Sequence, residues 1–244
     1  MRMQDSNRPE YSGTSELENI EQNLPNYNLR LVRLFLHNMR PKQESADFHF
    51  VDFGAGIGTL AQLFLTEYGL RPAVIEIDPS LLERLQNLGF QTYQSANEIP
   101  KESYAACYSS NVLEHIPDDQ ASLCDIHKIL KPGGRLVIYV PAFEVLWSPM
   151  DDQVGHLRRY RKMKLKKLVT SSGFRVLSCD YSDSVGFFTS LFLRLFQNQK
   201  RFGVNNKHSL AFYDKFIYPI SIFLDGLGLR YFFGKNLLLV AEKI

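Results

Sequence analysis

The sequence has few cysteines, no long apolar run and almost no net charge, and each shortage excludes a class of protein. Cys107, Cys124 and Cys179 are odd in number and far apart, so they form neither a disulfide framework nor a zinc-ligand spacing, and we expect free thiols. No stretch reaches the roughly 18 uninterrupted apolar residues of a membrane span. The nearest, Phe216–Leu224, is short and contains a proline and a serine. Twenty-eight basic and 26 acidic residues leave a net charge of +2, which predicts no nucleic-acid partner.

The rest of the composition is that of an ordinary globular protein. The chain has 244 residues, of which 45% are hydrophobic and 22% charged, which excludes a disordered chain and fits one α/β domain. Residues 1–22 are polar and lack the apolar core of a secretion signal, so we expect a flexible N-terminal arm. We expect a cytoplasmic protein, with contact to a membrane surface left open.

From Tyr27 to Asp180, short apolar runs of strand type alternate with helical periods. The first helix is expected over Tyr27–Met39. The expected strands are Phe48–Phe53, Ala73–Ile77, Phe90–Tyr93, Tyr104–Ser109, Arg135–Val140 and Phe174–Asp180. The expected later helices are Thr59–Tyr68, Asp78–Leu88, Asp118–Leu130 and Lys162–Ser171. This alternation predicts a doubly wound α/β domain with a mostly parallel sheet.

The segment 184–234 breaks the alternation because it is crowded with aromatic and other apolar residues. We expect a C-terminal, aromatic-rich helical insertion there. The core then spans 23–183, and 235–244 returns to its sheet as the final strand. The sequence leaves open whether the insertion is a substrate lid, a dimer face, a membrane contact or a further layer of the core.

Gly54, Gly56 and Gly58 follow the first predicted strand and open a helix, as in many nucleotide-cofactor sites. The sixth position of this turn is Thr59 rather than the glycine of the dinucleotide pattern. Asp52 places an acid just before the turn. A carboxylate there favours a positively charged ligand over a pyrophosphate.

Glu76 is a second acid that fits a cofactor site. It ends the next predicted strand, where a carboxylate can accept both hydroxyl groups of a ribose. The alternative is that Glu76 and Asp78 only cap the following helix. Because Asp78-Pro79 already provides a cap, Glu76 is the candidate ribose ligand.

Four segments have the order and spacing of the motifs of a known family. They are Asp52–Gly58, Glu76–Pro79, Ser110–Pro117 and Leu130–Gly134. Over about Tyr27 to Asp180 the chain resembles class I S-adenosylmethionine-dependent methyltransferases, and Asn236–Ile244 resembles the final antiparallel strand of that family. The resemblance implies a Rossmann-like, seven-stranded sheet, S-adenosyl-L-methionine as the cofactor and S-adenosyl-L-homocysteine as the product.

The resemblance also implies roles for single residues of the cofactor site. Gly54, Ala55, Gly56 and Gly58 would pass under the methionine moiety, with Asp52 near its amino group. Glu76 would hold the ribose, and Ile77 would pack on the adenine. The other implied cofactor contacts are Tyr27, Ser95, Ala96, Asn111 and Val112.

Glu114 and His115 resemble part of a Glu-x-x-Glu-His pattern that binds a metal in some relatives. Asn111 stands at the first position of that pattern, which leaves a poor set of ligands. We therefore expect no metal, and a structural or substrate-facing role for the pair, with His115 as a candidate catalytic residue.

The loop after the fifth predicted strand contains a D-x-x-x-G-H-x-R-R-Y pattern from Asp151 to Tyr160. This pattern resembles a methyltransferase subgroup of type 11/12, which is often associated with cell-envelope or glycan genes. His156 is the candidate base for an acceptor hydroxyl or amine, and the alternative is that His156 and Arg158 only pin the loop. The candidate substrate contacts are Trp147, Arg158, Arg159 and Tyr160.

Seven basic residues lie between Arg158 and Lys167. Such a run is usually a solvated helix face, and otherwise it contacts anionic lipid headgroups or a phosphorylated acceptor.

We expect a methyltransferase whose acceptor is a small molecule, apolar or linked to a lipid or glycan. The acceptor atom, the oligomeric state and peripheral membrane contact stay open. One alternative is a non-catalytic partner subunit that binds S-adenosylmethionine, because Ser95 and Ala105 replace acids that are common in the family. The other is a nicotinamide-dependent oxidoreductase, which Thr59 and Asp52 disfavour.

Overall fold

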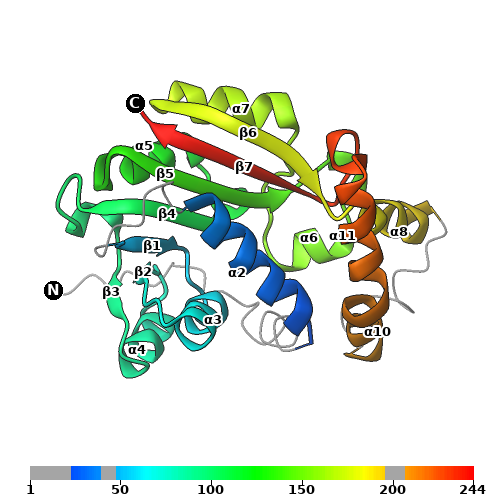
Figure 1. The fold of residues 1–244 in the computed structure, drawn as a ribbon, viewed down its shortest axis with the longest axis horizontal. Coiled ribbons are helices and arrows are strands. Elements are labelled where there is room, and N and C mark those ends of the chain that lie inside the picture. Colours follow the sequence, from blue (N-terminus) through cyan, green and yellow to red (C-terminus); the bar gives the residue numbers. More distant parts are fainter. Residues whose placement is uncertain (1–22, 40–47, 196–206) are drawn as a thin grey trace, which may run out of the picture.

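The computed structural model describes residues 23–39, 48–195 and 207–244 (Figure 1). The arm predicted for residues 1–22 and residues 196–206 of the predicted insertion lie outside the described residues.

In the described part of the chain, seven strands form one sheet with the order β3-β2-β1-β4-β5-β7-β6. They are β1 (Phe50–Phe53), β2 (Ala73–Ile75), β3 (Gln91–Tyr93), β4 (Tyr104–Ser110), β5 (Leu130–Pro141), β6 (Phe174–Ser182) and β7 (Asn236–Lys243). The pairs from β3 to β5 are parallel, and β7 is antiparallel to both β5 and β6. The mostly parallel, doubly wound sheet with an antiparallel last strand is confirmed.

The strand β5 begins earlier than the sequence predicts, at Leu130 rather than Arg135. Leu130 pairs with Tyr104, and the register of β4 and β5 then shifts, so that Ala106 pairs with Arg135. The Lys131–Gly134 segment bends between these two pairs, with Gly133 at φ +74°. Pairing with β4 on both sides of this irregular segment therefore extends β5 back to Leu130.

Helices cover both faces of the sheet. The α-helices of the described residues are α2 (Pro25–Met39), α3 (Thr59–Tyr68), α4 (Pro79–Asn87), α5 (Asp119–Ile129), α6 (Pro149–Gln153), α7 (Lys162–Ser171), α8 (Ser184–Leu195), α10 (Lys207–Phe212) and α11 (Tyr218–Gly226). Successive strand residues point to opposite faces. Tyr108 packs with Phe35 of α2 and Phe64 of α3, whereas Cys107 belongs to a cluster with Leu123 of α5 and Leu165 of α7.

The helices α8, α10 and α11, which follow β6, form a helical layer at one end of the sheet (Figure 1). A π-helical turn, Tyr213–Ile217, joins α10 to α11, and α11 packs against α8. Asp214 of this turn accepts hydrogen bonds from the backbone N–H groups of Asn26 (3.0 Å) and Tyr27 (2.8 Å), at the first turn of α2. Among the described residues, no helix combines the length and the apolar character needed to cross a bilayer.

Candidate active site

Most of the predicted site residues follow the carboxyl ends of β1, β2, β4 and β5, while Tyr27 lies on α2, and Ser95 and Ala96 follow β3. Because these strands are parallel, their carboxyl ends lie along one edge of the sheet, which is where open α/β sheets bind ligands. The glycine turn follows β1, Glu76 follows β2, Asn111 follows β4, and the loop with His156 follows β5.

The glycine turn uses backbone conformations that other residues rarely adopt. Gly54, Gly56 and Gly58 have φ angles of +82°, +55° and +84°. The N–H groups of Gly54 and Ala55 both donate to the carbonyl oxygen of Ile75, at 2.9 and 3.1 Å, which ties the turn to β2. A Cβ at Gly54 would lie 2.4 Å from Cγ2 of Val112. The fold therefore brings these two residues, both predicted for the cofactor site, into contact.

Glu76 is buried, and its carboxylate is held by backbone groups. Its Oε2 accepts from the N–H of Gly56 at 2.7 Å, and its Oε1 accepts from the N–H of Asp78 at 3.0 Å. Asp78 itself caps α4 through Ser80 and Leu81, as predicted. Each Glu76 oxygen keeps a lone pair for a further donor. The next side chain, Ile77, is 75% exposed.

Other predicted cofactor contacts have partners within the protein. Asp52 is buried and accepts a hydrogen bond from the hydroxyl of Tyr108 at 2.6 Å. The hydroxyl of Tyr27 lies 3.1 Å from that of Tyr139, and burial raises the pKa of Tyr27 well above its ordinary value. Ser95 caps a short 3-10 turn, Ala96–Glu98. The cofactor contacts of these residues remain predictions.

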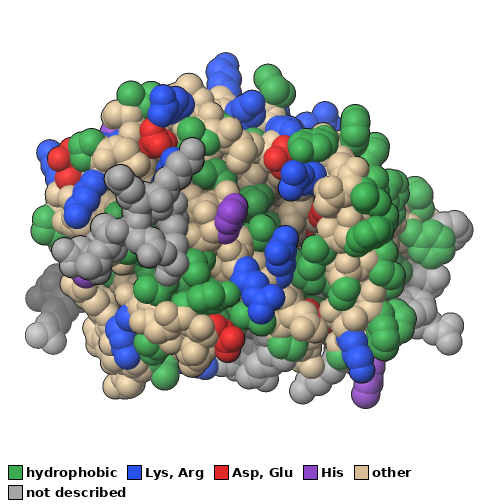
Figure 2. Space-filling view, in the orientation of Figure 1, with side chains coloured by type: hydrophobic (Ala, Val, Ile, Leu, Met, Phe, Trp, Pro, Cys, Tyr) green, Lys and Arg blue, Asp and Glu red, His purple; other side chains and the backbone are tan. Residues whose placement is uncertain are grey.

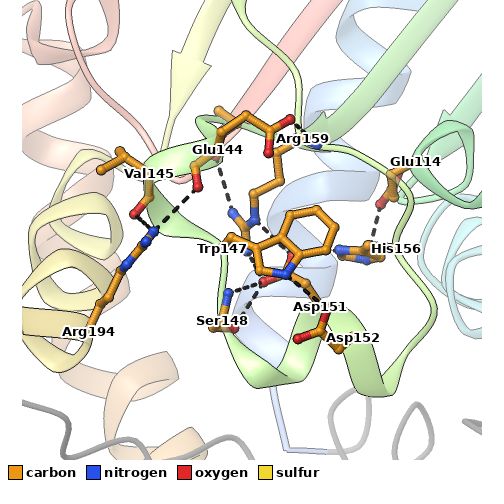
Figure 3. Close-up of polar contacts among 11 residues, drawn as sticks. Glu114, Glu144, Val145, Trp147, Ser148, Asp151, Asp152, His156, Arg159 and Arg194 are labelled. Carbon is orange, nitrogen blue, oxygen red and sulfur yellow. Dashed lines mark hydrogen bonds and ion pairs between the residues drawn. The ribbon is translucent and has the colours of Figure 1, made fainter.

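Asp151 organises the loop after β5 (Figure 3). Its carboxylate accepts the N–H and hydroxyl of Ser148 at 2.8 and 2.9 Å, and Nε and Nη2 of Arg159 at 2.8 and 3.0 Å. Nδ1 of His156 lies 2.7 Å from its Oδ1. Burial alone would raise the pKa of Asp151, but the hydrogen bonds from His156 and Arg159 hold it well below its ordinary value. Asp151 is therefore an ionised carboxylate at neutral pH.

Glu114 faces the other side of the His156 ring. Its Oε1 lies 3.8 Å from Nε2 of His156, the carboxyl is fully buried, and neither oxygen has a hydrogen-bond partner. Burial raises the pKa of Glu114 to about 8, so the carboxyl is protonated at neutral pH. The ring of His115 packs edge-on against that of His156, with centroids 4.7 Å apart, and burial lowers the pKa of His115 to about 4.

Glu114, His115 and His156 also form a group that could hold a cation. Each offers one ligand atom, and these atoms all lie within 4.8 Å of one another. The Glu-x-x-Glu-His pattern contains Asn111 and not His156, so the approach of His156 to Glu114 and His115 is visible only in the fold.

Arg158 and Tyr160 hold the loop against the first turn of α5. Nη1 of Arg158 lies 2.8 Å from Oδ2 of Asp119, and the hydroxyl of Tyr160 donates to the same oxygen at 2.8 Å. Trp147 is half-buried and donates from Nε1 to Asp152 at 3.0 Å. These contacts fit the pinning role that the sequence left open for Arg158. Substrate contact by Trp147, Arg158, Arg159 and Tyr160 remains a prediction.

The role of Asp151 was not recognised from sequence, although the residue begins the loop pattern. The helix α6 that contains it is only five residues long, too short to show a hydrophobic period. The available signal was Ser148-x-x-Asp151, the spacing of a capping box, which the structure forms.

Comparison with known proteins connects this site to a family. A family model for the methyltransferase domain matches residues 21–179, more than half of the chain. The chain belongs to the class I S-adenosylmethionine-dependent methyltransferases. The family that the sequence motifs resemble is thus confirmed.

Individual relatives of this methyltransferase are distant. An O-methyltransferase of Pyrenophora dematioidea is 27% identical over 169 residues, which make up 62% of this chain and 61% of the relative. The solved phosphoethanolamine N-methyltransferase 2 of Haemonchus contortus, in complex with phosphomonomethylethanolamine and S-adenosylhomocysteine, has a TM-score of 0.60 at 17% identity, covering 98% of this chain and 59% of that one. A SAM-dependent methyltransferase of Archaeoglobus fulgidus has a TM-score of 0.59 at 16% identity, covering 88% of this chain and 92% of that one. The methyltransferase spans about three fifths of the length of the first curated relatives it matches.

The residues of this methyltransferase fit S-adenosylmethionine, the cofactor of the family. The cofactor carries a cationic sulfur, a ribose and an adenine. Asp52 and Glu76 are buried carboxylates next to the glycine turn, since Asp52 precedes it and Glu76 accepts from the N–H of Gly56; carboxylates suit a cation and ribose hydroxyls. Ile77 leaves an exposed apolar surface directly after Glu76 that an adenine can cover.

Proposed function

We propose that this methyltransferase transfers the methyl group to a hydroxyl oxygen of a small apolar or lipid-linked molecule, with His156 as the base. The observation that carries the proposal is the pairing of His156 Nδ1 with the ionised Asp151 at 2.7 Å. When bound, S-adenosylmethionine supplies a methyl group on a cationic sulfur, which keeps the electron pair of the broken bond. The remaining task of the chain is to align the acceptor, exclude water and remove one proton.

The pairing with Asp151 supports one tautomer of His156. An ionised carboxylate only accepts hydrogen bonds, so Nδ1 of His156 must carry a proton that it donates to Asp151. When the ring acts as a base, Nε2 has the free lone pair and is the atom that accepts the hydroxyl proton. Asp151 acts as a positioning residue, because it orients the ring and stabilises the imidazolium that forms.

The protonation of Glu114 suits this role of His156. A protonated Glu114 places no negative charge beside Nε2, so no fixed ion pair occupies the atom that must receive the proton. His115 stays neutral as well, so it adds no positive charge that would repel an imidazolium.

Aromatic side chains next to the loop after β5 support an apolar acceptor. Phe143, which follows β5 by two residues, packs on Tyr181 and on Phe187 of α8, with ring centroids 4.7 and 5.2 Å apart. Arg194 of α8 donates to the carbonyl oxygens of Glu144 and Val145 (Figure 3). We infer that the segment 184–234 forms one wall of the acceptor site on a core of residues 23–183. An oxygen acceptor is also favoured by the O-methyltransferase of Pyrenophora dematioidea.

The test incubates the full chain with S-adenosylmethionine labelled at the methyl group and with fractionated cell extract. We expect label in an apolar or lipid fraction. His156→Ala should lower turnover by about 100-fold or more, the usual contribution of a general base, while leaving S-adenosylhomocysteine affinity unchanged. His37→Ala, at an exposed position on α2, is the matched control. Label in no fraction contradicts methyl transfer, and wild-type turnover in His156→Ala contradicts the base.

A further inference from the structure

The helix from α10 through α11 exposes its apolar side and buries its polar side. Phe212, Phe216, Ile220, Phe223 and Leu227 recur every three or four residues, and each is 51–68% exposed. They form one stripe along the helix, and Figure 2 shows hydrophobic side chains gathered on this side of the molecule. The short turn after α11 adds Tyr231 and Phe232, which are also exposed. A surface helix normally has the opposite arrangement.

The polar residues of the same helix hold it to the rest of the protein. Asp214 accepts the backbone N–H groups at the start of α2. The hydroxyl of Ser221 accepts from the N–H of Val185 at 3.0 Å, and Asp225 accepts from the N–H groups of Asp183 and Ser184 at 2.8 and 3.2 Å. These contacts fix the orientation of the helix, so the apolar stripe cannot turn inward without breaking them.

The charges on this surface have one sign. Asp214 and Asp225 are the only acids between residues 207 and 233, and both bind backbone groups of other elements as described. The exposed basic side chains are Lys215, next to Phe216 in the stripe, and Arg230, next to Tyr231. A partner for this surface must therefore offer an apolar layer bordered by negative charge.

We propose that the outward face of α10–α11, with Tyr231 and Phe232, docks the methyltransferase on the surface of a bilayer that contains anionic lipids. Aromatic and aliphatic side chains enter the boundary between headgroups and acyl chains, and basic side chains pair with anionic headgroups. The helix lies in the plane of the membrane, since its charged residues exclude it from the apolar layer. A second copy of the chain is a poorer partner, because a two-fold interface on this face would bring Lys215 and Arg230 toward their own copies.

This proposal is connected to the proposed function, because an enzyme docked on a membrane reaches lipid-linked acceptors directly. The binding measurement nevertheless needs neither cofactor nor acceptor. Failure to bind vesicles would leave the methyl-transfer proposal intact, and failure of methyl transfer would leave this one intact.

The test is sedimentation of the full chain with vesicles of phosphatidylcholine, alone or mixed with phosphatidylserine. The double variant Phe216→Gln/Phe223→Gln removes two stripe residues, and Lys215→Gln/Arg230→Gln removes the two charges. Lys164→Gln/Lys167→Gln is the matched control, because it removes the same charge from exposed positions on α7. Thermal unfolding and S-adenosylhomocysteine titration show that each variant is folded.

We expect the wild type to bind the mixed vesicles more strongly than phosphatidylcholine alone. Both α11-side double variants should weaken binding by about tenfold or more, while the α7 control stays close to wild type. Three results would overturn the proposal: no vesicle binding by the wild type, equal loss in the α7 control, or unchanged binding by Phe216→Gln/Phe223→Gln. A dimer in light scattering that this variant dissociates, without vesicle binding, would instead assign the face to a second copy.

Discussion

The substitution Asp151→Asn probes the centre of the loop after β5. Asp151 is 1% exposed and accepts five hydrogen bonds, two of them from Arg159, whose side chain is 8% exposed. Asparagine keeps the size of the side chain but removes its charge and one acceptor oxygen. Arg159 is left as a buried cation without its counter-ion, and the Nδ1–H of His156 loses its ionised acceptor.

Removing one partner of a buried ion pair destabilises a protein by about 3–5 kcal/mol. Because asparagine retains one acceptor oxygen, we expect a loss near the lower end, about 3 kcal/mol, in the free energy of unfolding measured with urea at pH 7. The neighbouring Asp152→Asn is the matched control, since Asp152 is exposed and its contact with Trp147 needs only one oxygen. A loss below about 1 kcal/mol in Asp151→Asn would refute the assignment of this network as structural.

The pH dependence of this difference has a definite sign. The folded-state pKa of Asp151 lies below its unfolded value of about 3.9, so its contribution is complete above that pH. The contribution is lost as the pH falls through the folded-state pKa. The stability difference between wild type and Asp151→Asn should therefore shrink as the pH falls below about 4, and a difference independent of pH would contradict this reasoning.

Three further predictions concern the turn, the buried acid and the cation question. Gly54→Ala places a Cβ at a φ of +82° and 2.4 Å from Val112. We expect the free energy of unfolding, measured with urea, to fall by about 2–4 kcal/mol. Val112→Ala should restore part of this loss, and no restoration would contradict the clash. Burial raises the pKa of Glu114 in the folded protein from its ordinary value of 4.5 to about 8, so wild-type stability should fall as the pH rises between these values. Glu114→Gln should therefore be more stable than the wild type above pH 8 but not near pH 5. Parallel pH profiles of unfolding for the two proteins would contradict this prediction. Prolonged EDTA treatment should leave methyl transfer unchanged, because His156 must keep Nε2 free as a base. A loss of methyl transfer that a divalent ion restores would instead assign Glu114, His115 and His156 to a metal site.

The fold was largely predictable because its elements carry clear hydrophobic periods. The helix Thr59–Tyr68 has its predicted bounds, since Gly58 and Gly69 flank it in left-handed conformations that only glycine adopts easily. The start of β5 was not predictable, because the pairing of Leu130 with Tyr104 depends on the neighbouring strand rather than on local sequence. The helix α6 was missed because a capping box, not a hydrophobic period, defines it.

The site was predictable where a motif fixes the backbone and not where side chains meet across the fold. The positions of Gly54 and Glu76 follow from the order of strands and turns. The approach of Glu114 to His156 depends instead on how the loop after β5 folds back over the end of β4. The sequence likewise shows that residues 184–234 are aromatic, but not that α11 turns its polar side inward.

We propose that Glu76 and the glycine turn hold S-adenosylmethionine at the carboxyl edge of the sheet. Calorimetric titration with S-adenosylhomocysteine tests it on the wild type, Glu76→Ala and Glu83→Ala, the last at an exposed position on α4. We expect wild-type and Glu83→Ala proteins to bind equally, and Glu76→Ala to bind more weakly by about 1–3 kcal/mol, because the hydrogen bonds to the ribose are lost. Equal affinity in all three proteins, or no binding by the wild type, would contradict the claim.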